Sequence, residues 1–559
     1  MITKQWLLNN LKELTTMNNT VKYWLVHPKV SKDLKAQIKA MSEQELAYAF
    51  NEKPLGFGTA GIRQKMGPGY RYLNDFTYAQ MAFGYGRFLI DKFGFSPRCV
   101  IAHDNRKNGV HFAKIITDVL TSMGIEVYLF DNNKISSTPI LSYAIPRYNA
   151  DGGINVTASH NRKTDNGFKT YNEKGAQLLN QDAQKIIDFM PKSCEILNLE
   201  YQPNDRLVKF IPDEIYDRYF ADIYRDLYTT DHKEVKDFKV IFTGQHGAAS
   251  YWLPEMLRRF NYNVIPVKEQ CKYDENFTYT KSPNPEARES WDLALKYAQH
   301  YGADIMLATD PDADRLAVAV KHNNEFRYFN GNEMGIIFAY YILKYKQLTK
   351  RPYIVSSYVS TNLIDRIIAK YNGVVYRVGT GFKWIGNKAI DHKDQEDFIL
   401  GFEEAIGALP TTIGSDKDSF QTAALALEIY NECLKRKITM VDFLEREIYP
   451  QFGFIHNDTI TTLINDLDWK KKANDWMERL KRYDQPYIND RKIVSIKWNQ
   501  AGDCLDWILE DDSWIRFRLS GTEPKFKFYY NLYGNSLKQL KEEANQITKT
   551  LKRYISLIK

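Results

Sequence analysis

Three aspartates, each separated from the next by one residue, are the first chemical signal in this sequence of 559 residues. Asp310, Asp312 and Asp314 follow the apolar segment ADIMLAT and precede the apolar segment LAVAV. Because Pro311 cannot continue a helix, the carboxylates are expected in a tight loop at the end of a buried strand. Three neighbouring carboxylates repel one another, and a divalent cation among them removes that cost. The spacing therefore predicts a metal site, with a solvated acidic turn as the alternative.

A serine stands on a turn after another apolar run. Ser159 lies in the segment INVTASHN, and a serine so placed is a nucleophile only when a neighbouring group activates it. The adjacent His160 is poorly placed to do so, because a side chain rarely reaches back to the preceding hydroxyl. The segment also lacks the GxSxG pattern of hydrolases. Taken alone, it favours a structural turn.

Two further segments carry residue types that are able to bind sugars and phosphates. Glu403 and Glu404 follow the apolar segment DFIL, and paired carboxylates can hold sugar hydroxyls or exchange protons. Alone, such a pair is more typical of solvated surface. Arg518 and Ser520 stand beside Gly521 in RLSGTEPK, where an Arg fork, hydroxyls and backbone amides suit a phosphate dianion. An ordinary hairpin turn is the alternative for this segment.

The elements that must position these residues follow a repeated pattern. Segments from Arg98, Phe238 and Arg351 each read as strand, amphipathic helix and strand, over about thirty residues, the size of a βαβ unit. The C-terminal part instead shows short strands in close succession from Lys492, followed by a helix from Ser536 that is expected to pack on them. The predicted fold is α/β, with three related α/β domains and a C-terminal α+β domain.

Composition restricts the classes of partner. The formal net charge is +7, from 76 Lys and Arg against 69 Asp and Glu. This mild excess suits small anionic substrates and does not form the concentrated basic block of a nucleic-acid binder. Five isolated cysteines indicate a reducing compartment, and no secretion signal or membrane-length apolar run is apparent. We expect a cytoplasmic protein, a monomer or homodimer, with no nucleic-acid or membrane partner.

Taken together, the four segments resemble the α-D-phosphohexomutase family, the phosphoglucomutase/phosphomannomutase enzymes. TASHN is similar to the family's phosphoserine loop, DPDADR to its metal loop, GFEEAIG to its sugar loop and RLSGTEPK to its phosphate loop. The resemblance extends over GFGTAGIRQKMGPG from Gly56, TPILSYAI from Thr138 and VGTGFKWIG from Val378, and runs from about residue 50 to 530. These forms are most similar to the branch of bacterial phosphoglucomutases and their phosphopentomutase-related relatives.

The resemblance implies four domains around a central active-site cleft, to which each contributes one loop. They are expected at residues 1–200 with the phosphoserine loop, 201–324 with the metal loop, 325–445 with the sugar loop and 446–559 with the phosphate loop. It also implies isomerisation of hexose 1-phosphate and hexose 6-phosphate, through a phosphoserine and a bisphosphorylated sugar. The implied substrates are sugar phosphates, and the implied cofactors are Mg²⁺ and glucose 1,6-bisphosphate.

Site residues carried over from the resemblance fall into three groups. The implied catalytic residues are Ser159, Lys169 and Lys417. The implied metal ligands are Asp310, Asp312 and Asp314, with Ser159 contributing through its phosphate. The implied substrate-binding residues are Arg63, Thr380, Gly381, Phe382, Glu403, Arg518, Ser520, Gly521 and Thr522.

Three departures from the family pattern leave the sugar open. Arg162 stands where Pro is common, Ala405 where the sugar loop usually has Ser, and Ser415 where Arg is common. A phosphopentomutase acting on ribose or deoxyribose 1-phosphate is therefore the alternative function. A phosphatase with Asp310 as nucleophile fits less well, because its motif has Thr or Val where this chain has Asp314. A sugar-phosphate-binding protein without catalysis would show a damaged serine or metal loop, and both loops are intact.

Overall fold

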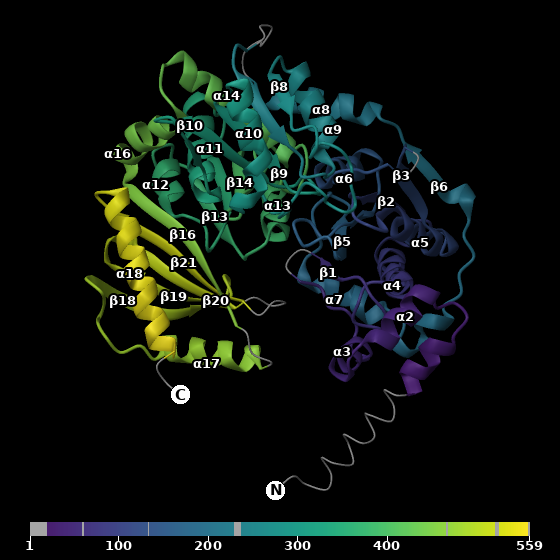
Figure 1. Cartoon of the computed structure of the whole chain (residues 1–559). Coiled ribbons are helices and arrows are strands. Elements are labelled where there is room, and N and C mark those ends of the chain that lie inside the picture. The colour runs from purple at the N-terminus through teal and green to yellow at the C-terminus, as the bar shows by residue number, and fades with distance from the viewer. Residues whose placement is uncertain are drawn as a thin grey trace, which may run out of the picture.

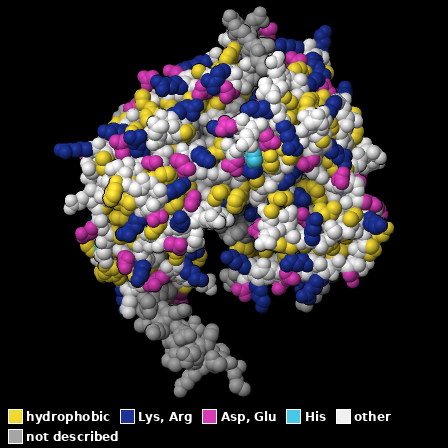
Figure 2. All heavy atoms as spheres, turned by 180° about the vertical axis from the view of Figure 1, so that it is seen from behind, with side chains coloured by type: hydrophobic (Ala, Val, Ile, Leu, Met, Phe, Trp, Pro, Cys, Tyr) yellow, Lys and Arg dark blue, Asp and Glu magenta, His cyan; other side chains and the backbone are white. Residues whose placement is uncertain are grey.

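Four β-sheets follow one another along the chain in the computed structural model, which describes residues 19–58, 61–131, 134–228, 236–464, 468–519 and 525–556. Figure 1 shows the four sheets arranged in an arc, with the N-terminal part (purple and blue) and the C-terminal part (yellow) at its two ends. Figure 2, seen from behind, shows a notch between these two ends. The predicted fold class, three α/β domains followed by a smaller domain with its own sheet, is confirmed.

The first sheet has the strand order β1-β5-β4-β2-β3-β6. Its strands are β1 (Ile62–Lys65), β2 (Arg98–His103), β3 (Glu126–Phe130), β4 (Gly152–Val156), β5 (Asp165–Asn172) and β6 (Val208–Ile211). The helices of this part are α2 (Lys32–Ala40), α3 (Glu43–Ala49), α4 (Asp75–Phe93), α5 (Gly109–Ser122), α6 (Thr138–Arg147) and α7 (Asn180–Phe189). β2 and β4 are buried along almost their whole length, as parallel strands covered by helices are.

The second sheet has the order β11-β10-β9-β7-β8. Its strands are β7 (Lys239–Thr243), β8 (Asn263–Pro266), β9 (Ile305–Thr309), β10 (Leu316–His322) and β11 (Glu325–Tyr328). Its helices are α8 (Glu214–Leu227), α9 (Ala249–Arg259) and α10 (Asp292–Tyr301). The third sheet has the order β13-β12-β14-β15. Its strands are β12 (Pro352–Ser357), β13 (Val374–Val378), β14 (Asp397–Glu403) and β15 (Gly407–Leu409), and its helices are α11 (Gly331–Tyr345), α12 (Leu363–Ala369), α13 (Phe382–Asp391) and α14 (Ser419–Lys435).

The fourth sheet is antiparallel, with the order β16-β21-β20-β19-β18-β17. Its strands are β16 (Phe454–Leu463), β17 (Tyr487–Ile488), β18 (Arg491–Asn499), β19 (Cys504–Leu509), β20 (Trp514–Leu519) and β21 (Lys525–Gly534). Short helical segments α15 (Met440–Asp442), η5 (Phe443–Ile448) and α16 (Tyr449–Phe452) lead into it. Two helices, α17 (Trp469–Lys481) and α18 (Leu537–Ser556), accompany it. Leu540, Ile547 and Leu551 of α18 are buried, as expected of a helix packed on the sheet.

The first three sheets share one topology, which places a functional turn at the same point in each. In each, two parallel strands joined by a helix pair beside a third parallel strand, and the chain then returns antiparallel. The return turns are β4–β5 with Ser159, β9–β10 with Asp310 and β14–β15 with Glu404. These turns lie at the carboxyl ends of the parallel strands, where open α/β sheets bind ligands.

Packing joins the first three parts into one body. A continuous apolar core runs from Ile140 of α6 through Tyr219 of α8 and Val240 of β7 to Phe402 of β14. The fourth part has a separate core around Trp507. Burial of apolar area on this scale fixes the three return turns relative to one another.

Two strands lie beyond the expected domain boundaries. β6 follows residue 200 but pairs with β3, and β11 follows residue 324 but pairs with β10. The first and second sheets therefore extend past the expected limits at these two points. Among the described residues, no helix is both long and apolar enough to cross a membrane.

Candidate active site

Ser159 and Asp310 meet although they come from different sheets. Ser159 Oγ donates a hydrogen bond to Asp310 Oδ2 at 2.9 Å, and both side chains are buried. Ser159 has a φ of 51°, in the left-handed region that residues with a Cβ rarely adopt. Such strain persists only when the surrounding structure imposes it, and it is common at functional sites. The β4–β5 turn thus holds the serine hydroxyl against the aspartate turn.

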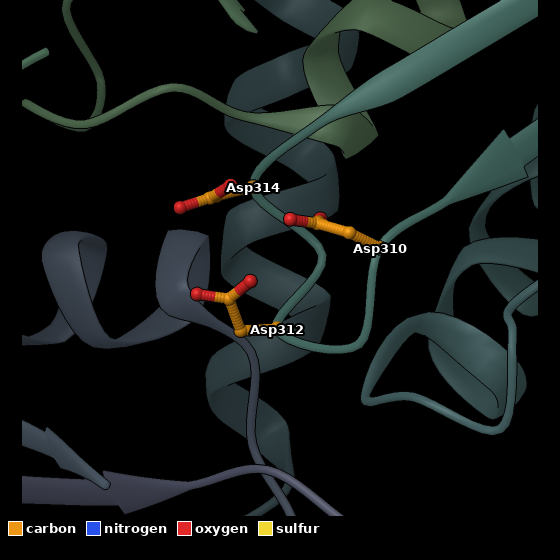
Figure 3. A group of neighbouring side chains, drawn as sticks. All are labelled: Asp310, Asp312 and Asp314. Carbon is orange, nitrogen blue, oxygen red and sulfur yellow. The ribbon is translucent and has the colours of Figure 1, made fainter. Parts of the chain in front are cut away.

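The three aspartates form a compact group of oxygen donors. Figure 3 shows their carboxylates projecting from the β9–β10 turn toward a common space. One oxygen of each lies within 4.8 Å of the others. Oδ1 of Asp312 and Oδ1 of Asp314 are buried and have no hydrogen-bond partner. Buried carboxylate oxygens without partners are unusual, and an all-oxygen set of this kind fits a hard cation such as Mg²⁺.

Two lysines from other parts of the chain contact the aspartates. Lys169 of β5 places Nζ 2.5 Å from Asp312 Oδ2 and 2.8 Å from Asp314 Oδ2. Lys417, just before α14, places Nζ 2.9 Å from Asp314 Oδ2. Burial acts to raise the pKa of Asp314, but Lys169 and Lys417 hold it well below its usual value. Burial and the other two carboxylates raise the pKa of Asp310 instead.

Two arginines add further positive charge. Arg315 Nε lies 3.8 Å from Asp310 Oδ2, and Arg63 of β1 interacts electrostatically with Asp312. Nε of each is buried without a hydrogen-bond partner. With Lys169 and Lys417, four cations face three carboxylates. Unpaired guanidinium donors of this kind favour an added anion.

His160 reaches the serine after all. Its Nδ1 lies 3.3 Å from Ser159 Oγ, so the expectation that the ring points away from that hydroxyl is wrong. The left-handed conformation of Ser159 turns the following side chain back, which an ordinary turn does not do. Burial, together with Arg315 and Arg63, holds the pKa of His160 well below its usual value. The imidazole is therefore neutral near pH 7.

Glu403 lies inside the protein beside this group. β14 extends through Glu403, so the residue ends a strand and only Glu404 enters the turn. The side chain of Glu403 is 6% exposed, which excludes the solvated-surface alternative for this residue. Burial raises its pKa to about 7, although Lys417 and Arg315 act to lower it. Lys417 Nζ also lies 5.5 Å from the ring centre of Phe382.

The remaining expected substrate-binding residues lie around α13 and β20. Thr380 Oγ1 is buried without a hydrogen-bond partner, and Gly381 precedes α13 with a φ of 109°, a conformation that glycine adopts readily. Arg518 of β20 also has a buried Nε without a partner, and its charge helps to lower the pKa of Lys383 after burial does. The other expected phosphate-binding residues, Ser520, Gly521 and Thr522, lie outside the described residues.

Contacts between the first and third parts hold Lys417 in place. Ser415 N donates to Ser142 Oγ at 2.9 Å. Asp416 Oδ2 accepts from the Tyr171 hydroxyl at 3.0 Å. Ser415, where the family commonly has Arg, is thus part of a buried junction and serves the segment that carries Lys417.

Thr138 and Arg106 also belong to this site, and the sequence reading missed both. Thr138 Oγ1 donates to Asp312 Oδ2 at 3.0 Å, and Arg106 Nη2 donates to the carbonyl of Ser159 at 2.6 Å. The only sequence signal for Arg106 is its place in HDNR, directly after a buried strand. Nothing in the sequence pairs Thr138 with an aspartate far along the chain.

The sequence matches three family domains in order. They are "Phosphoglucomutase/phosphomannomutase, alpha/beta/alpha domain I" at residues 54–195, domain II at 217–323 and domain III at 330–447. A phosphomannomutase of Mycoplasmoides pirum is 50% identical over 542 residues, covering 97% of this chain and 100% of that relative. A phosphoglucomutase of Staphylococcus haemolyticus is 32% identical over 515 residues, covering 88% of this chain and 93% of that relative.

Solved structures show the same fold. The crystal structure of a putative phosphomannomutase from Thermus thermophilus superposes with a TM-score of 0.70 at 21% identity, covering 89% of this chain and 100% of that one. The sequence matches, the shared fold and the four motifs in the family's order along the sequence lead to one assignment. The chain belongs to the α-D-phosphohexomutase (phosphoglucomutase/phosphomannomutase) family and is an isomerase of the intramolecular phosphotransferase class.

Proposed function

We propose that this chain interconverts hexose 1-phosphate and hexose 6-phosphate through a phosphoserine at Ser159 and a bisphosphorylated sugar. The observation that carries the proposal is the 2.9 Å contact between Ser159 Oγ and Asp310 Oδ2, within a buried group of three carboxylates and four cations. A phosphoryl group on Ser159 would stand beside unpaired guanidinium donors and unpaired carboxylate oxygens. Similarity to a phosphomannomutase and a phosphoglucomutase supports hexose as the sugar.

The transfer itself needs little covalent chemistry from the protein. The P–O bond to Ser159 breaks while a new P–O bond forms to the free sugar hydroxyl, whose proton returns to the serine oxygen. The bisphosphate then turns over, and its other phosphoryl group passes back to Ser159. Catalysis of this kind consists mainly of positioning and of stabilising charge on the transferred group.

Lys169 and Lys417 suit the charged part of this work. Burial acts to lower the pKa of Lys417, but Asp314 and Asp416 hold it above its usual value, so its ammonium stays charged at neutral pH. A charged ammonium stabilises phosphoryl oxygens and donates a proton more readily than it accepts one. Lys169, which donates hydrogen bonds to Asp312 and Asp314, is proposed to stabilise the phosphoryl oxygens in the same way.

Asp310, Asp312 and Asp314 would hold Mg²⁺. The cation would supply positive charge that stabilises the phosphoryl group on Ser159. Glucose 1,6-bisphosphate is the proposed activator, because it can phosphorylate Ser159 when the enzyme has lost its phosphoryl group. The phosphorylated protein is then the resting form of the enzyme.

The sugar and its second phosphate would occupy the space between the third and fourth parts. Glu403 is the proposed hydroxyl ligand, beside Thr380 with its unpaired Oγ1. Gly381 and Phe382 line the same place at the start of α13. Arg518, with Ser520, Gly521 and Thr522, is proposed to bind the phosphate that does not react.

A coupled mutase assay tests this function. It compares glucose 1-phosphate, mannose 1-phosphate and ribose 1-phosphate, each with glucose 1,6-bisphosphate present. Glucose and mannose phosphates differ only in the orientation of the hydroxyl at carbon 2. A hydroxyl that a site does not contact contributes little to discrimination between substrates. Because Glu403 is proposed to reach other ring hydroxyls, both should be isomerised within about 30-fold of each other in kcat/KM, about 2 kcal/mol. Much faster isomerisation of ribose 1-phosphate would contradict the hexose assignment.

Ala405 tests how the sugar loop discriminates. The residue is half-buried in the β14–β15 turn, where the family usually has Ser. Ala405→Ser adds one hydroxyl to the loop that carries Glu403. It is expected to raise the preference for hexose over ribose phosphate, measured as the ratio of their kcat/KM values. An unchanged ratio would mean that position 405 does not contact the sugar.

The raised pKa of Glu403 predicts a pH dependence. With a pKa of about 7, Glu403 is neutral below that pH and accepts two hydroxyl donors only above it. The value of kcat/KM should therefore rise as the pH rises through about 7. Glu403→Gln should lower kcat/KM and remove this rise. Comparison on the same substrate separates the effect from the ionisation of the substrate phosphate.

Stability provides the second readout for Glu403. Its folded pKa lies above the usual 4.5, so between pH 4.5 and 7 the unfolded chain loses this proton first. As the pH rises through that range, the free energy of unfolding should fall by about 3 kcal/mol from this group alone. Glu403→Gln should flatten that part of the pH–stability curve. A variant curve parallel to the wild type would show that the carboxyl is not held neutral.

A further inference from the structure

One arginine outside the four loops binds the backbone of the Ser159 turn. Arg106 follows β2 and is 2% exposed. Its Nη2 donates to the carbonyl oxygens of Ser159 and Asn161 at 2.6 and 2.7 Å. Its Nη1 donates to the carbonyl oxygens of Arg162 and Asp165 at 2.7 and 3.0 Å. A single guanidinium group thus holds four carbonyls of one turn.

Asp104 and Thr157 complete the network. Arg106 Nε donates to Asp104 Oδ2 at 3.1 Å, so all five N–H groups of the guanidinium are used. Thr157 Oγ1 donates to the same carboxylate oxygen at 2.5 Å and accepts from the backbone N–H of Ser159 at 2.8 Å. The Arg106 and Asp104 side chains are fully buried. The network therefore hydrogen-bonds both the backbone N–H and the backbone carbonyl of Ser159.

We propose that Arg106 is a positioning residue, which holds Ser159 in the left-handed conformation from which the serine exchanges its phosphoryl group. The proposal rests on the phosphoserine role given to Ser159 above. A φ of 51° is unfavourable for a residue with a Cβ, so the turn relaxes when its carbonyls lose their donors. The Ser159 hydroxyl then leaves its position 2.9 Å from Asp310 Oδ2. A displacement of about 1 Å lowers a rate by about 100-fold.

Lysine cannot replace this guanidinium. Its three N–H donors radiate from one nitrogen, whereas the Arg106 fork reaches carbonyls on two sides and a carboxylate. Arg106→Lys is expected to lower kcat by about 100-fold per folded molecule, with KM for the sugar phosphate within about threefold of wild type. KM should change little because the proposed sugar and phosphate ligands lie on other turns. A purely structural role predicts a lower melting temperature with normal kcat per folded molecule.

Chemical rescue is a readout that does not depend on the stability of the fold. Arg106 and Asp104 lie at the wall of a cavity of about 930 Å³ beside α5 and β3. In Arg106→Gly, millimolar guanidinium chloride, well below denaturing concentrations, should raise kcat about tenfold. Urea or sodium chloride at the same concentration should not. The absence of rescue together with wild-type-like kcat in Arg106→Lys would overturn the proposal.

Two variants complete the test. Arg491→Lys is the control, because it alters a partly buried arginine of the fourth part whose Nη2 donates to the carbonyl of Tyr533 at 2.7 Å. This substitution should lower stability without lowering kcat. If the Arg106 variants do not fold, Thr157→Val tests the same network, because it removes a single hydroxyl. The kcat of this variant should be about tenfold below wild type. Wild-type kcat in Thr157→Val, or a change in KM alone, overturns the inference. A wild-type enzyme without mutase activity would instead overturn the proposed function.

Discussion

Ser159→Ala is expected to lower kcat by about 10⁴-fold or more, because it removes the only oxygen proposed to carry the phosphoryl group. The substitution removes the hydrogen bonds of Ser159 Oγ with Asp310 Oδ2 and His160 Nδ1 and leaves the backbone of the turn unchanged. The free energy of unfolding should therefore change by only about 1 kcal/mol. The coupled mutase assay measures the first effect, and chemical denaturation measures the second.

Two other serine variants serve as controls. Ser159→Gly also removes the hydroxyl, but glycine adopts the φ of 51° readily, so it should be inactive and at least as stable as Ser159→Ala. Ser250→Ala changes a buried serine of α9 whose Oγ has no hydrogen-bond partner, and it should keep full activity. A Ser159→Ala enzyme that keeps more than about one hundredth of wild-type kcat would show that another group takes the phosphoryl group.

Removal of the metal is expected to have the next largest effect. Exhaustive treatment with EDTA should abolish turnover, and Mg²⁺ should restore it in preference to Zn²⁺, because the three proposed ligands are all carboxylates. Asp312→Asn removes one charged ligand whose Oδ1 has no other partner. It should lower kcat by about 100-fold and raise the Mg²⁺ concentration needed for half-maximal activity by about tenfold.

The control for the metal is an aspartate just before the same strand. Asp304 is exposed, and its Oδ1 lies 3.3 Å from Lys321 Nζ, away from the three ligands. Asp304→Asn should leave both kcat and the Mg²⁺ requirement unchanged. Full activity of the wild type after exhaustive chelation would contradict the metal site. An Asp312→Asn enzyme with normal Mg²⁺ dependence would remove Asp312 from the ligand set.

Much of the fold could be predicted from the sequence, because the relevant signals are local. The segments from Arg98, Phe238 and Arg351 each form two parallel strands joined by a helix. Apolar runs and an amphipathic helix specify such a unit without reference to the rest of the chain. The strands β6 and β11 follow the expected boundaries at residues 200 and 324, although each pairs with a strand that precedes its boundary.

The candidate site was predictable only as separate loops. Glu403 looked like a surface residue because burial depends on Lys417 and other groups that the sequence does not place beside it. His160 looked remote from Ser159 because the left-handed φ of that serine is imposed by tertiary contacts. Arg106 showed the same limit, as its carbonyl partners lie more than 50 residues away. The sequence shows which residues have side chains able to do chemistry, but it does not show how the fold orients those side chains.

The most direct test of the account follows the phosphoryl group itself. The enzyme is incubated with glucose 1,6-bisphosphate carrying ³²P, digested, and its labelled peptide identified by mass spectrometry. The account predicts label on a peptide containing Ser159 that survives hydroxylamine and passes to unlabelled hexose 1-phosphate at the rate of turnover. Label on Asp310 that hydroxylamine releases, or label on Ser159 that does not reach the sugar, would contradict the phosphoserine mechanism.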